Sequence, residues 1–304
     1  MSRCSKKSEK GVALVLTLVI LVVLTAMVTE FAYGVYMTNL SLYNWRDSQR
    51  LSLVASSAVT LTVKNLVEVE KLNPYTYPGK AELGLGGIVG DYNGAVGIRV
   101  EDENSKFNIN SIVWPNGALN ERSYKSLGKL LVVLGVDESV ADRVADRIDA
   151  DTDERLPGSE DGEKNGYFES TSELFLIEAV SRQDCEKLLP YLTVYGLEGP
   201  ASDTVNINTA SVPVIMSLGE DITEDLAQRV VSYRDLLPFE SPGQLTKVAG
   251  FEGTLGQSLM GRISVKAVNF SITAEAEENG VKRSISAVVA LRDASALIRY
   301  WMER

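Results

Sequence analysis

Histidine is absent from the 304 residues of this chain, and cysteine occurs only at Cys4 and Cys185. Without histidine, the Ser-His-Asp and Cys-His classes of hydrolase and the usual zinc sites are excluded. The GxxxxGKS/T phosphate loop is also absent, and the glycine-rich segment 84–97 lacks the GxGxxG spacing. Cys185 is expected to be a small buried apolar residue. These absences leave an enzymatic function with little support.

Proline is missing from residues 12–72, and charge is missing from residues 12–28, which read VALVLTLVILVVLTAMV. About 18 apolar residues are enough to cross a bilayer as a helix. The basic residues that precede the run are Arg3, Lys6, Lys7 and Lys10. Such a flank holds the N-terminus of the helix in the cytoplasm, and no cleavage site of a secretory signal peptide follows the run. We therefore expect the residues after Glu30 to lie outside the cytoplasm.

The same helix is expected to continue beyond the membrane, because Leu51, Val54, Ala58 and Leu61 recur at spacings of three and four. This spacing indicates one amphipathic face. Residues 71–74 (Lys-Leu-Asn-Pro) supply a stop signal. The helix would have up to about sixty residues and a length of about 90 Å. Its second half would pack on a globular head.

The short basic segment ends at Gly11, and Val12 begins the apolar run. A glycine directly before such a helix is where prepilin peptidases cut, so Gly11 and Val12 form a candidate processing site. An uncleaved signal anchor with a helical stalk is the alternative. Cleavage would remove four positive and one negative side chains and would change the formal net charge from -11 to -14. So acidic a head is a poor partner for nucleic acid or for anionic lipid.

The middle of the chain contains a weak internal repeat. The matching pairs, in the same order, are 107–111 (FNINS) and 205–209 (VNINT), 141–149 (ADRVADRID) and 227–235 (AQRVVSYRD), and 168–174 (FESTSEL) and 239–245 (FESPGQL). Each unit is expected to contain an extended segment, a helix with one apolar face and a second short helix. The apolar faces are Val140, Val144 and Ile148 in the first unit and Leu226, Val230 and Val231 in the second. Two such helical modules bury a core jointly.

The second short helix has an N-cap signal in both units. Ser170 or Ser241 precedes it, with Glu173 or Gln244 three residues later. In the second unit, residues 238–251 resemble a helix-hairpin-helix, whose glycine turn often binds DNA phosphates. Lys247 is the only basic residue around that turn in the sequence, and acidic residues flank it. Because phosphate binding requires positive charge, a structural module is favoured over a DNA-binding one.

The first unit contains an acidic segment that the second lacks, between its longer helix and the FES motif. The candidate calcium ligands in it are Asp149, Asp151 and Asp153 at loop positions one, three and five, Arg155 through its carbonyl at seven, and Glu160 at twelve. These carboxylates repel one another unless a cation neutralises them. A structural calcium ion is therefore the favoured interpretation, and magnesium, which retains its waters, is less suitable.

This loop also departs from the usual calcium-loop pattern. Glu154 stands where calcium loops have glycine, and Pro157 stands at position nine. An acidic surface loop that is simply solvated is the alternative.

The C-terminal fifth alternates apolar and polar residues, which is the period of half-buried strands. The predicted strands are 263–268, 270–276 and 281–291, with a turn at 277–280, and 97–101 before the first repeat is another strand. The helical block therefore interrupts a sheet that begins before it and ends after it.

The chain resembles the minor pseudopilin K (GspK) family of the type II secretion system over nearly its whole length. The residues that carry the resemblance are 10–24 (KGVALVLTLVILVVL), 146–160 (DRIDADTDERLPGSE), 188–196 (LLPYLTVYG) and the FNINS, FESTSEL and VNINTAS motifs. The resemblance implies an α+β fold in which a pilin-like long N-terminal helix packs on a small antiparallel sheet, with a large all-α domain inserted into the sheet. It also implies calcium in the head at the acidic loop, where Asp161 and Glu163 remain unassigned as ligands.

The resemblance further implies a non-enzymatic, single-pass inner-membrane protein with a periplasmic head at the tip of the pseudopilus. Its partners would be prepilin peptidase, the inner-membrane secretion platform, and other minor pseudopilins through the helix and head. Most pilin-like proteins have glutamate as the fifth mature residue, which pairs with a neighbour's N-terminal amine in the membrane, and here that residue is Leu16. The missing carboxylate and the bulky insert both favour a tip. A minor tip pilin of a type IV pilus and an exported DNA receptor are the alternatives.

The expected domains follow from these segments. They are a leader at 1–11, the transmembrane half of the helix at 12–30, the amphipathic helix and first part of the pilin-like domain at 31–106, an inserted helical domain at 107–262 with units at 107–198 and 205–262, and C-terminal strands at 263–304.

Overall fold

The structure is a computed structural model that describes residues 6–76, 81–84, 94–150, 153–157, 159, 164–177, 180–292 and 295–304. Its α-helices are α1 (Lys6–Leu72), α2 (Glu121–Val133), α3 (Val140–Ile148), α4 (Arg182–Leu188), α5 (Val212–Ser217), α6 (Glu224–Leu236) and α7 (Thr254–Ser258). Its 3-10 helices are η1 (Glu103–Ser105), η2 (Ile109–Ile112), η3 (Thr171–Leu176), η4 (Leu189–Tyr191) and η5 (Pro242–Lys247). Its strands are β1 (Ala81–Gly84), β2 (Ala95–Asp102), β3 (Phe107–Asn108), β4 (Leu192–Thr193), β5 (Val205–Asn206), β6 (Ile263–Ser264), β7 (Asn269–Glu278), β8 (Val281–Arg292) and β9 (Ser295–Glu303).

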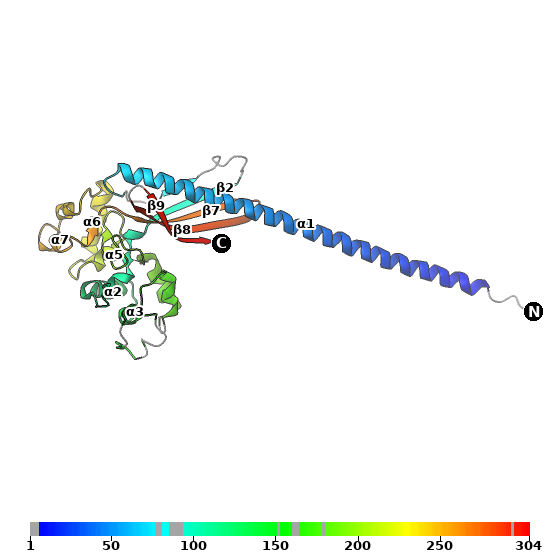
Figure 1. The fold of residues 1–304 in the computed structure, drawn as a ribbon, viewed down its shortest axis with the longest axis horizontal. Coiled ribbons are helices and arrows are strands. Elements are labelled where there is room, and N and C mark those ends of the chain that lie inside the picture. Colours follow the sequence, from blue (N-terminus) through cyan, green and yellow to red (C-terminus); the bar gives the residue numbers. More distant parts are fainter. Residues whose placement is uncertain are drawn as a thin grey trace, which may run out of the picture.

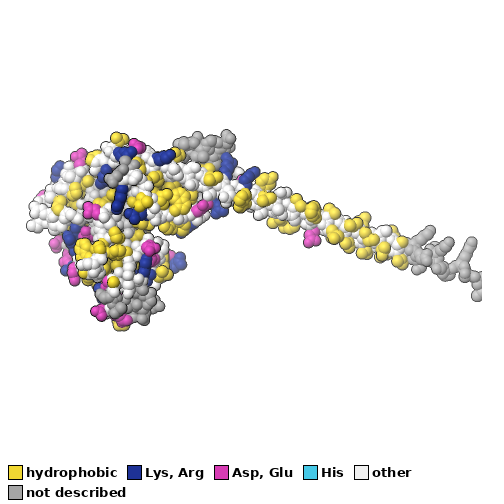
Figure 2. Space-filling view, in the orientation of Figure 1, with side chains coloured by type: hydrophobic (Ala, Val, Ile, Leu, Met, Phe, Trp, Pro, Cys, Tyr) yellow, Lys and Arg dark blue, Asp and Glu magenta, His cyan; other side chains and the backbone are white. Residues whose placement is uncertain are grey.

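Helix α1 is one continuous helix that extends far beyond the head (Figure 1). Within the described chain it is the one helix long and apolar enough to cross a membrane, with an 18-residue window of mean hydropathy 2.9. Figure 2 shows this part as a mostly apolar shaft. The helix ends where the sequence predicts, because the Asn73 backbone N–H and side chain both donate to the Val69 carbonyl, at 3.2 and 2.9 Å, before Pro74.

The head is built on a five-stranded antiparallel sheet with the strand order β1-β2-β7-β8-β9. The second half of α1 packs on one face, where alternate residues of β2, β7 and β8 are buried. The prediction for this helical face is confirmed for Leu51, Val54 and Ala58 but is wrong for Leu61, which is 45% exposed. At about 100° per residue, the buried stripe is centred near Ala55, and Leu61 points away from it.

Three of the four predicted strands are found in this sheet, as β2, β7 and β8. The turn between β7 and β8 is also confirmed, because Asn279 and Gly280 have φ values of +53° and +77°, as a two-residue hairpin turn requires. The prediction of a strand at 263–268 is wrong beyond Ser264. There the Val265 carbonyl accepts a bond from Thr76 N–H, and the Ala267 N–H donates to the Thr76 hydroxyl, so the backbone pairs with the end of α1.

The helical insert leaves and rejoins the sheet through two neighbouring strands. Asp102 at the end of β2 lies opposite Phe270 in β7, and residues 103–268 form the insert between them. Buried Asn104 closes this neck, because its Oδ1 accepts bonds from the N–H groups of Val268 and Asn269, at 2.9 and 2.8 Å. Its Nδ2 donates to the Tyr195 carbonyl at 3.1 Å.

The insert consists of two units with the same internal connections, as the sequence repeat predicts. Short parallel pairs, β3 with β4 and β5 with β6, begin and end the units. In the first unit, Asn110 Oδ1 accepts from the Phe168 N–H at 2.8 Å, and Nδ2 donates to the Phe168 carbonyl at 3.0 Å. In the second unit, Asn208 makes the same two bonds to Phe239, both at 2.9 Å. We call this pairing the asparagine clasp.

Each unit surrounds its own apolar core, so the expectation that the two modules bury one core jointly is wrong. The predicted face of α3 is confirmed, since Val140, Val144 and Ile148 are all buried in the first core. In α6, Val230 is fully buried and its predicted neighbours Leu226 and Val231 pack against the second core. Cys185 is also fully buried in the first core, as expected.

Asp102 joins the sheet to the second unit. Its carboxylate accepts bonds from Asn206 Nδ2 at 2.8 Å, from the Thr209 hydroxyl at 2.5 Å and from the Asn104 N–H at 2.7 Å. None of these donors carries a charge. Burial raises the pKa of Asp102 to about 6, although the three hydrogen bonds oppose this.

We predict that Asp102→Asn flattens the pH dependence of stability between about pH 4 and 6. The pKa is about 6 in the folded chain, whereas an ordinary aspartate has a pKa of 3.8, so the wild type loses stability as the pH rises through this window, by up to about 3 kcal/mol. The variant cannot titrate and should lack this loss. Urea unfolding of the full chain in detergent measures the difference.

The control is Asp137→Asn, at the start of the α3 region. Bonds from the Ser139 side chain and N–H lower the pKa of Asp137, so the wild type loses this contribution as the pH falls. Because that loss lies below the ordinary pKa of 3.8, this substitution should leave the slope between about pH 4 and 6 as in the wild type. If the free energy of unfolding had the same pH dependence in the wild type and in Asp102→Asn, the prediction would be contradicted.

Candidate functional site

The predicted processing residues lie on an uncovered part of α1. Gly11 and Val12 are within the helix, and outside the helix itself no described atom lies within 4 Å of the Cβ position of Gly11. Leu16 is also exposed, as is every residue from Gly11 to Arg46. The head therefore leaves this whole stretch accessible to a peptidase, to lipid and to other helices.

An aromatic, uncharged stretch follows Glu30 on the same helix. Residues 31–45 contain no charged side chain, and their exposed aromatic residues are Phe31, Tyr33, Tyr36, Tyr43 and Trp45. Tyrosine and tryptophan concentrate at membrane–water interfaces. Fifteen residues extend about 22 Å along a helix, which is longer than such an interface needs. The stretch was not predicted as a functional surface, although its aromatic content was readable in the sequence.

The acidic loop begins at the end of α3. Asp149 is the C-cap residue of this helix and is buried, whereas Asp153 is exposed. Two of the predicted ligands, Asp151 and Glu160, lie outside the described residues, as do Asp161 and Glu163. The structure therefore brings Asp149 and Arg155 together but does not place the complete predicted ligand set.

Arg155 bridges a buried pair of carboxylates. Its Nη1 contacts Asp149 Oδ2 at 2.6 Å and also forms an ion pair with Asp146, which is fully buried. The Arg155 N–H donates to Asp146 Oδ2 at 3.0 Å, and the Ser159 hydroxyl donates to the same oxygen. Asp146 was not predicted, because it lies inside the amphipathic pattern of α3. Its closeness in sequence to Asp149, the first predicted ligand, was the only sign that Asp146 belongs to this cluster.

Arg155 was predicted to bind calcium through its backbone carbonyl. The structure gives its side chain a separate part, as the partner of two carboxylates. Burial disfavours the charged guanidinium, but the bonds to Asp146 and Asp149 outweigh this and raise the pKa of Arg155 above its usual range. The side chain is therefore a permanent cation at the place where a bound metal was expected. The two acidic side chains carry one more unit of charge than this guanidinium supplies.

The donor chemistry of this cluster suits a hard cation. Carboxylate oxygens are the ligands that calcium prefers, and Asp146 and Asp149 present them from one helix turn. Among the described residues there is no group of three His, Cys, Asp or Glu side chains placed to hold a metal ion. Of the remaining predicted carboxylates, Asp153 is exposed, and Asp151 and Glu160 lie outside the described residues.

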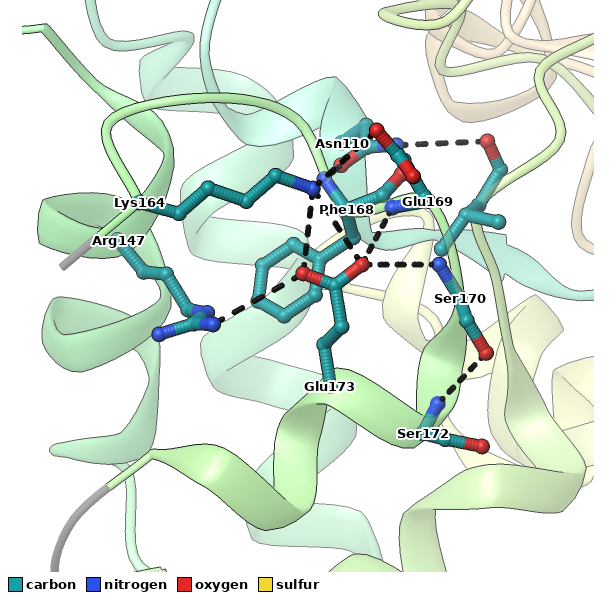
Figure 3. A network of polar contacts seen from close by, with 9 residues as sticks. Asn110, Arg147, Lys164, Phe168, Glu169, Ser170, Ser172 and Glu173 are labelled. Carbon is teal, nitrogen blue, oxygen red and sulfur yellow. Dashed lines mark hydrogen bonds and ion pairs between the residues drawn. The ribbon is translucent and has the colours of Figure 1, made fainter.

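The far end of the loop is held by Glu173 (Figure 3). Its Oε1 accepts from the N–H groups of Glu169 and Ser170 at 2.7 and 3.1 Å, and Lys164 lies 3.3 Å from its other oxygen. Arg147 on α3 lies 3.8 Å away as a second cation. These bonds lower the pKa of Glu173, although burial alone would raise it. The capping box predicted at Ser170 and Glu173 is confirmed.

The second unit closes the same region without a loop. Gln244 accepts from the Glu240 N–H at 3.0 Å, as Glu173 does from Glu169, but Ser241 makes no side-chain cap bond. In the following hairpin turn, Gly250 has a φ of +97°, and its N–H donates to the Glu252 carboxylate at 2.7 Å. A carboxylate of the chain itself therefore already accepts the hydrogen bond from the amide that a DNA phosphate would need.

Comparison with known proteins gives one consistent family. Two models of type II secretion system (T2SS), protein K, match residues 105–197 and 205–266, which together are about half of the chain. A curated relative from Pseudomonas aeruginosa, type II secretion system protein K, is 32% identical over 174 residues. That match covers 52% of this chain and spans about half of the relative, at 50%.

A solved structure confirms the fold. One chain in the crystal structure of the GspK-GspI-GspJ complex from the enterotoxigenic Escherichia coli type 2 secretion system superposes with a TM-score of 0.68. The alignment covers 86% of this chain and 98% of that chain, at 16% sequence identity. The predicted α+β architecture, with a long helix on an antiparallel sheet and a helical insertion, is therefore confirmed.

We predict that Arg155→Gln destabilises the head by about 2 to 3 kcal/mol in metal-free buffer. The substitution leaves Asp146 and Asp149 without the cation that the structure places against them. Urea unfolding of the full chain in detergent measures the loss. Arg182→Gln is the control, because its ion pair with Glu186 is exposed and should contribute about 0.5 kcal/mol or less. Equal effects of the two substitutions would contradict the prediction.

Proposed function

The chain belongs to the type II secretion system protein K (GspK) family, and from this premise we propose that it is a minor pseudopilin at the tip of the periplasmic pseudopilus. In this role it helps to initiate assembly of the pseudopilus, which exports folded proteins, and it performs no catalysis. The observation that carries the proposal is α1, which is uncovered from Gly11 to Arg46 and buried against the sheet beyond that point.

Helix α1 supports an inner-membrane location with the head in the periplasm. Its apolar first half is preceded by basic residues, which favour a cytoplasmic N-terminus. The aromatic stretch 31–45 then presents an exposed surface between the apolar run and the head. Neighbouring pseudopilin helices would cover this surface in an assembled complex.

Leu16 and the insert support the end position. A carboxylate at the fifth mature residue would pair with a neighbour's amine in the membrane, where an unpaired charge is costly. Leu16 cannot make this ion pair, so this subunit suits the tip of the pseudopilus, where no such pair with a further subunit is required. The helical insert lies on the side of the head away from the shaft, as Figure 1 shows, and it would obstruct a further subunit there.

The partners follow from the family and from the solved relative. That structure is of a complex containing GspK, GspI and GspJ. We infer that a prepilin peptidase cuts this chain between Gly11 and Val12. The processed chain then assembles with GspI- and GspJ-like minor pseudopilins and contacts the inner-membrane secretion platform.

Calcium is proposed as a structural ion of the acidic loop. Asp149, Asp151, Asp153 and Glu160 would supply carboxylates, and Arg155 its carbonyl, with Asp146 as a further buried carboxylate at the start of the loop. The buried carboxylates of Asp146 and Asp149 at the start of the loop support this proposal, because carboxylate oxygens suit a hard cation. A bound calcium ion would contribute charge neutralisation and a fixed loop conformation.

We predict that Gly11→Leu prevents both processing and assembly. In cells that hold a type II secretion system, the wild-type chain should begin at Val12 and co-purify with GspI- and GspJ-like proteins. The variant should retain its basic leader and lose at least fivefold in co-purification, because charged residues resist withdrawal into the membrane. N-terminal sequencing and quantitative mass spectrometry of the detergent extract provide the readouts.

The control for this experiment is Gly243→Ala in the head, since no described atom lies within 4 Å of the Cβ position of Gly243 and the residue lies outside α1. This variant should be processed and assembled normally. A wild-type chain that still begins before Gly11 in the presence of the peptidase would show that it is an uncleaved anchor. Processing without co-purification would reject the proposed complex.

We predict that calcium at about 100 times its dissociation constant raises the Tm of the full chain by roughly 5 to 10 °C. Asp153→Asn should at least halve this shift, because it removes an exposed ligand without disturbing the core. Asp235→Asn is the control, since Asp235 occupies the matching helix end in the second unit, which has no acidic loop. An equal shift in all three proteins, or no shift, would exclude calcium from this loop.

A further inference from the structure

The two units of the insert enclose an open hollow of about 370 Å³ where they meet. One wall is the exposed face of α2, from the first unit. The other wall is formed by the end of α5, by Ser258 of α7 and by Arg262, all from the second unit. Neither the acidic loop nor the uncovered part of α1 contributes to it, so the hollow is separate from the sites described above.

The lining of this hollow is cationic in a chain with a formal net charge of -11. Its four basic side chains are Arg122, Lys125, Lys129 and Arg262, and its two acidic ones are Glu121 and Glu220. Arg122 and Lys125 are exposed, and neither forms an ion pair with a described residue. Like charges gathered in a concave surface raise the local concentration of counter-ions.

Arg262 forms the floor of the hollow. It is buried, and its guanidinium donates to the Leu218 carbonyl and, at 2.9 Å, to the Ser126 hydroxyl. Asp203 is its only ion-pair partner among the described residues, at 3.4 Å. Burial lowers the pKa of Arg262, and the charge of Asp203 does not fully offset this, while Arg122 adds repulsion. The floor is therefore a buried guanidinium with one acidic partner.

Ser126 lines the hollow with a hydroxyl group that can still donate a hydrogen bond. Its oxygen accepts the bond from Arg262, and the hydroxyl donates to no residue in the described part of the chain. The buried side chain lies on α2 one residue after Lys125 and four after Arg122. Residues three and four apart on a helix share one face. A ligand above Ser126 is therefore within reach of two mobile cations.

Lys129 fixes the opposite wall rather than offering a free charge. Its ammonium group donates to the carbonyls of Gly219, Glu220 and Ile222, at 2.5, 2.8 and 2.9 Å. These contacts hold the chain after α5 against α2. The hollow is thus pre-formed by bonds between the two units.

We propose that this hollow binds a small oxyanion, a carboxylate or a phosphate, through Arg122, Lys125 and the Ser126 hydroxyl. Paired cations and a hydroxyl donor provide charge-assisted hydrogen bonds to such a group. Glu121 and Glu220 at the rim repel extended polyanions, so the site selects a compact ligand over nucleic acid. The bound anion supplies negative charge to Arg122 and Lys125, which form no ion pair with a described residue.

Isothermal titration calorimetry of the full chain in neutral detergent tests the proposal, with inorganic phosphate and citrate as probes and ionic strength held constant with chloride. We expect saturable binding of at least one probe, weakened at least tenfold by Arg122→Gln/Lys125→Gln. Binding of phosphate alone identifies a phosphate site, and binding of citrate alone identifies a carboxylate site. Both substitutions are on exposed side chains, and an unchanged Tm without ligand verifies folding.

Arg182→Gln/Lys187→Gln is the matched control, because it removes the same two charges from exposed positions on α4. This protein should bind as the wild type does. Absence of saturable binding for both probes would overturn the proposal. An equal loss of affinity in the two double variants would also overturn it, because the effect would then come from net charge and not from the hollow.

Discussion

The neck between the sheet and its insert is the constraint on which the rest of the head depends. An insert of this size must leave and rejoin the sheet through adjacent strands, and the backbone groups there are removed from water without a complete ladder of partners. Buried unpaired backbone groups are costly. Asn104 supplies the missing bonds to Val268 and Asn269, and its other amide end reaches the first unit at Tyr195. Asp102 binds the second unit at the same place. Both units are therefore fixed to the sheet at one point, and the insert can be large without weakening the strand pairing.

The asparagine clasp explains how the two units can differ so much between their shared motifs. Asn110 and Asn208 fix the backbone at Phe168 and Phe239 directly, independently of the segment that leads to each phenylalanine. The first unit can therefore carry a long acidic loop where the second connects directly. Such a loop places carboxylates near the buried end of α3, and Arg155 within the loop is the side chain that meets them. Burying a charge without a partner is costly, so the loop and its arginine act as one element.

Features with a local period were predictable from the sequence, and features that depend on distant partners were not. The helix, its stop at Asn73 and the strands β2, β7 and β8 each have a pattern or a turn signal of their own. β9 was missed because its apolar residues include the exposed Leu297, Ile298 and Trp301 and because a bulge interrupts its register. In the acidic loop, the spacing revealed Asp149 but not Asp146, whose role depends on a bond made by Arg155 nine residues later. Asn104 binds residues more than 160 positions away, and no periodicity reports such a contact.

The distribution of charge within the second unit shows why a helix-hairpin-helix need not bind an anion at its turn. The Gly250 amide is satisfied by Glu252, whose pKa is lowered by bonds from its own N–H and that of Gly250, so this carboxylate stays ionised over the neutral range. A phosphate at the turn would have to displace a charge that is already in place. A buried positive charge of the unit lies instead at its contact with the first unit, where Arg262 has a single acidic partner among the described residues. The hairpin geometry of this unit therefore serves packing, and the anion site that we propose lies at the joint between the two units.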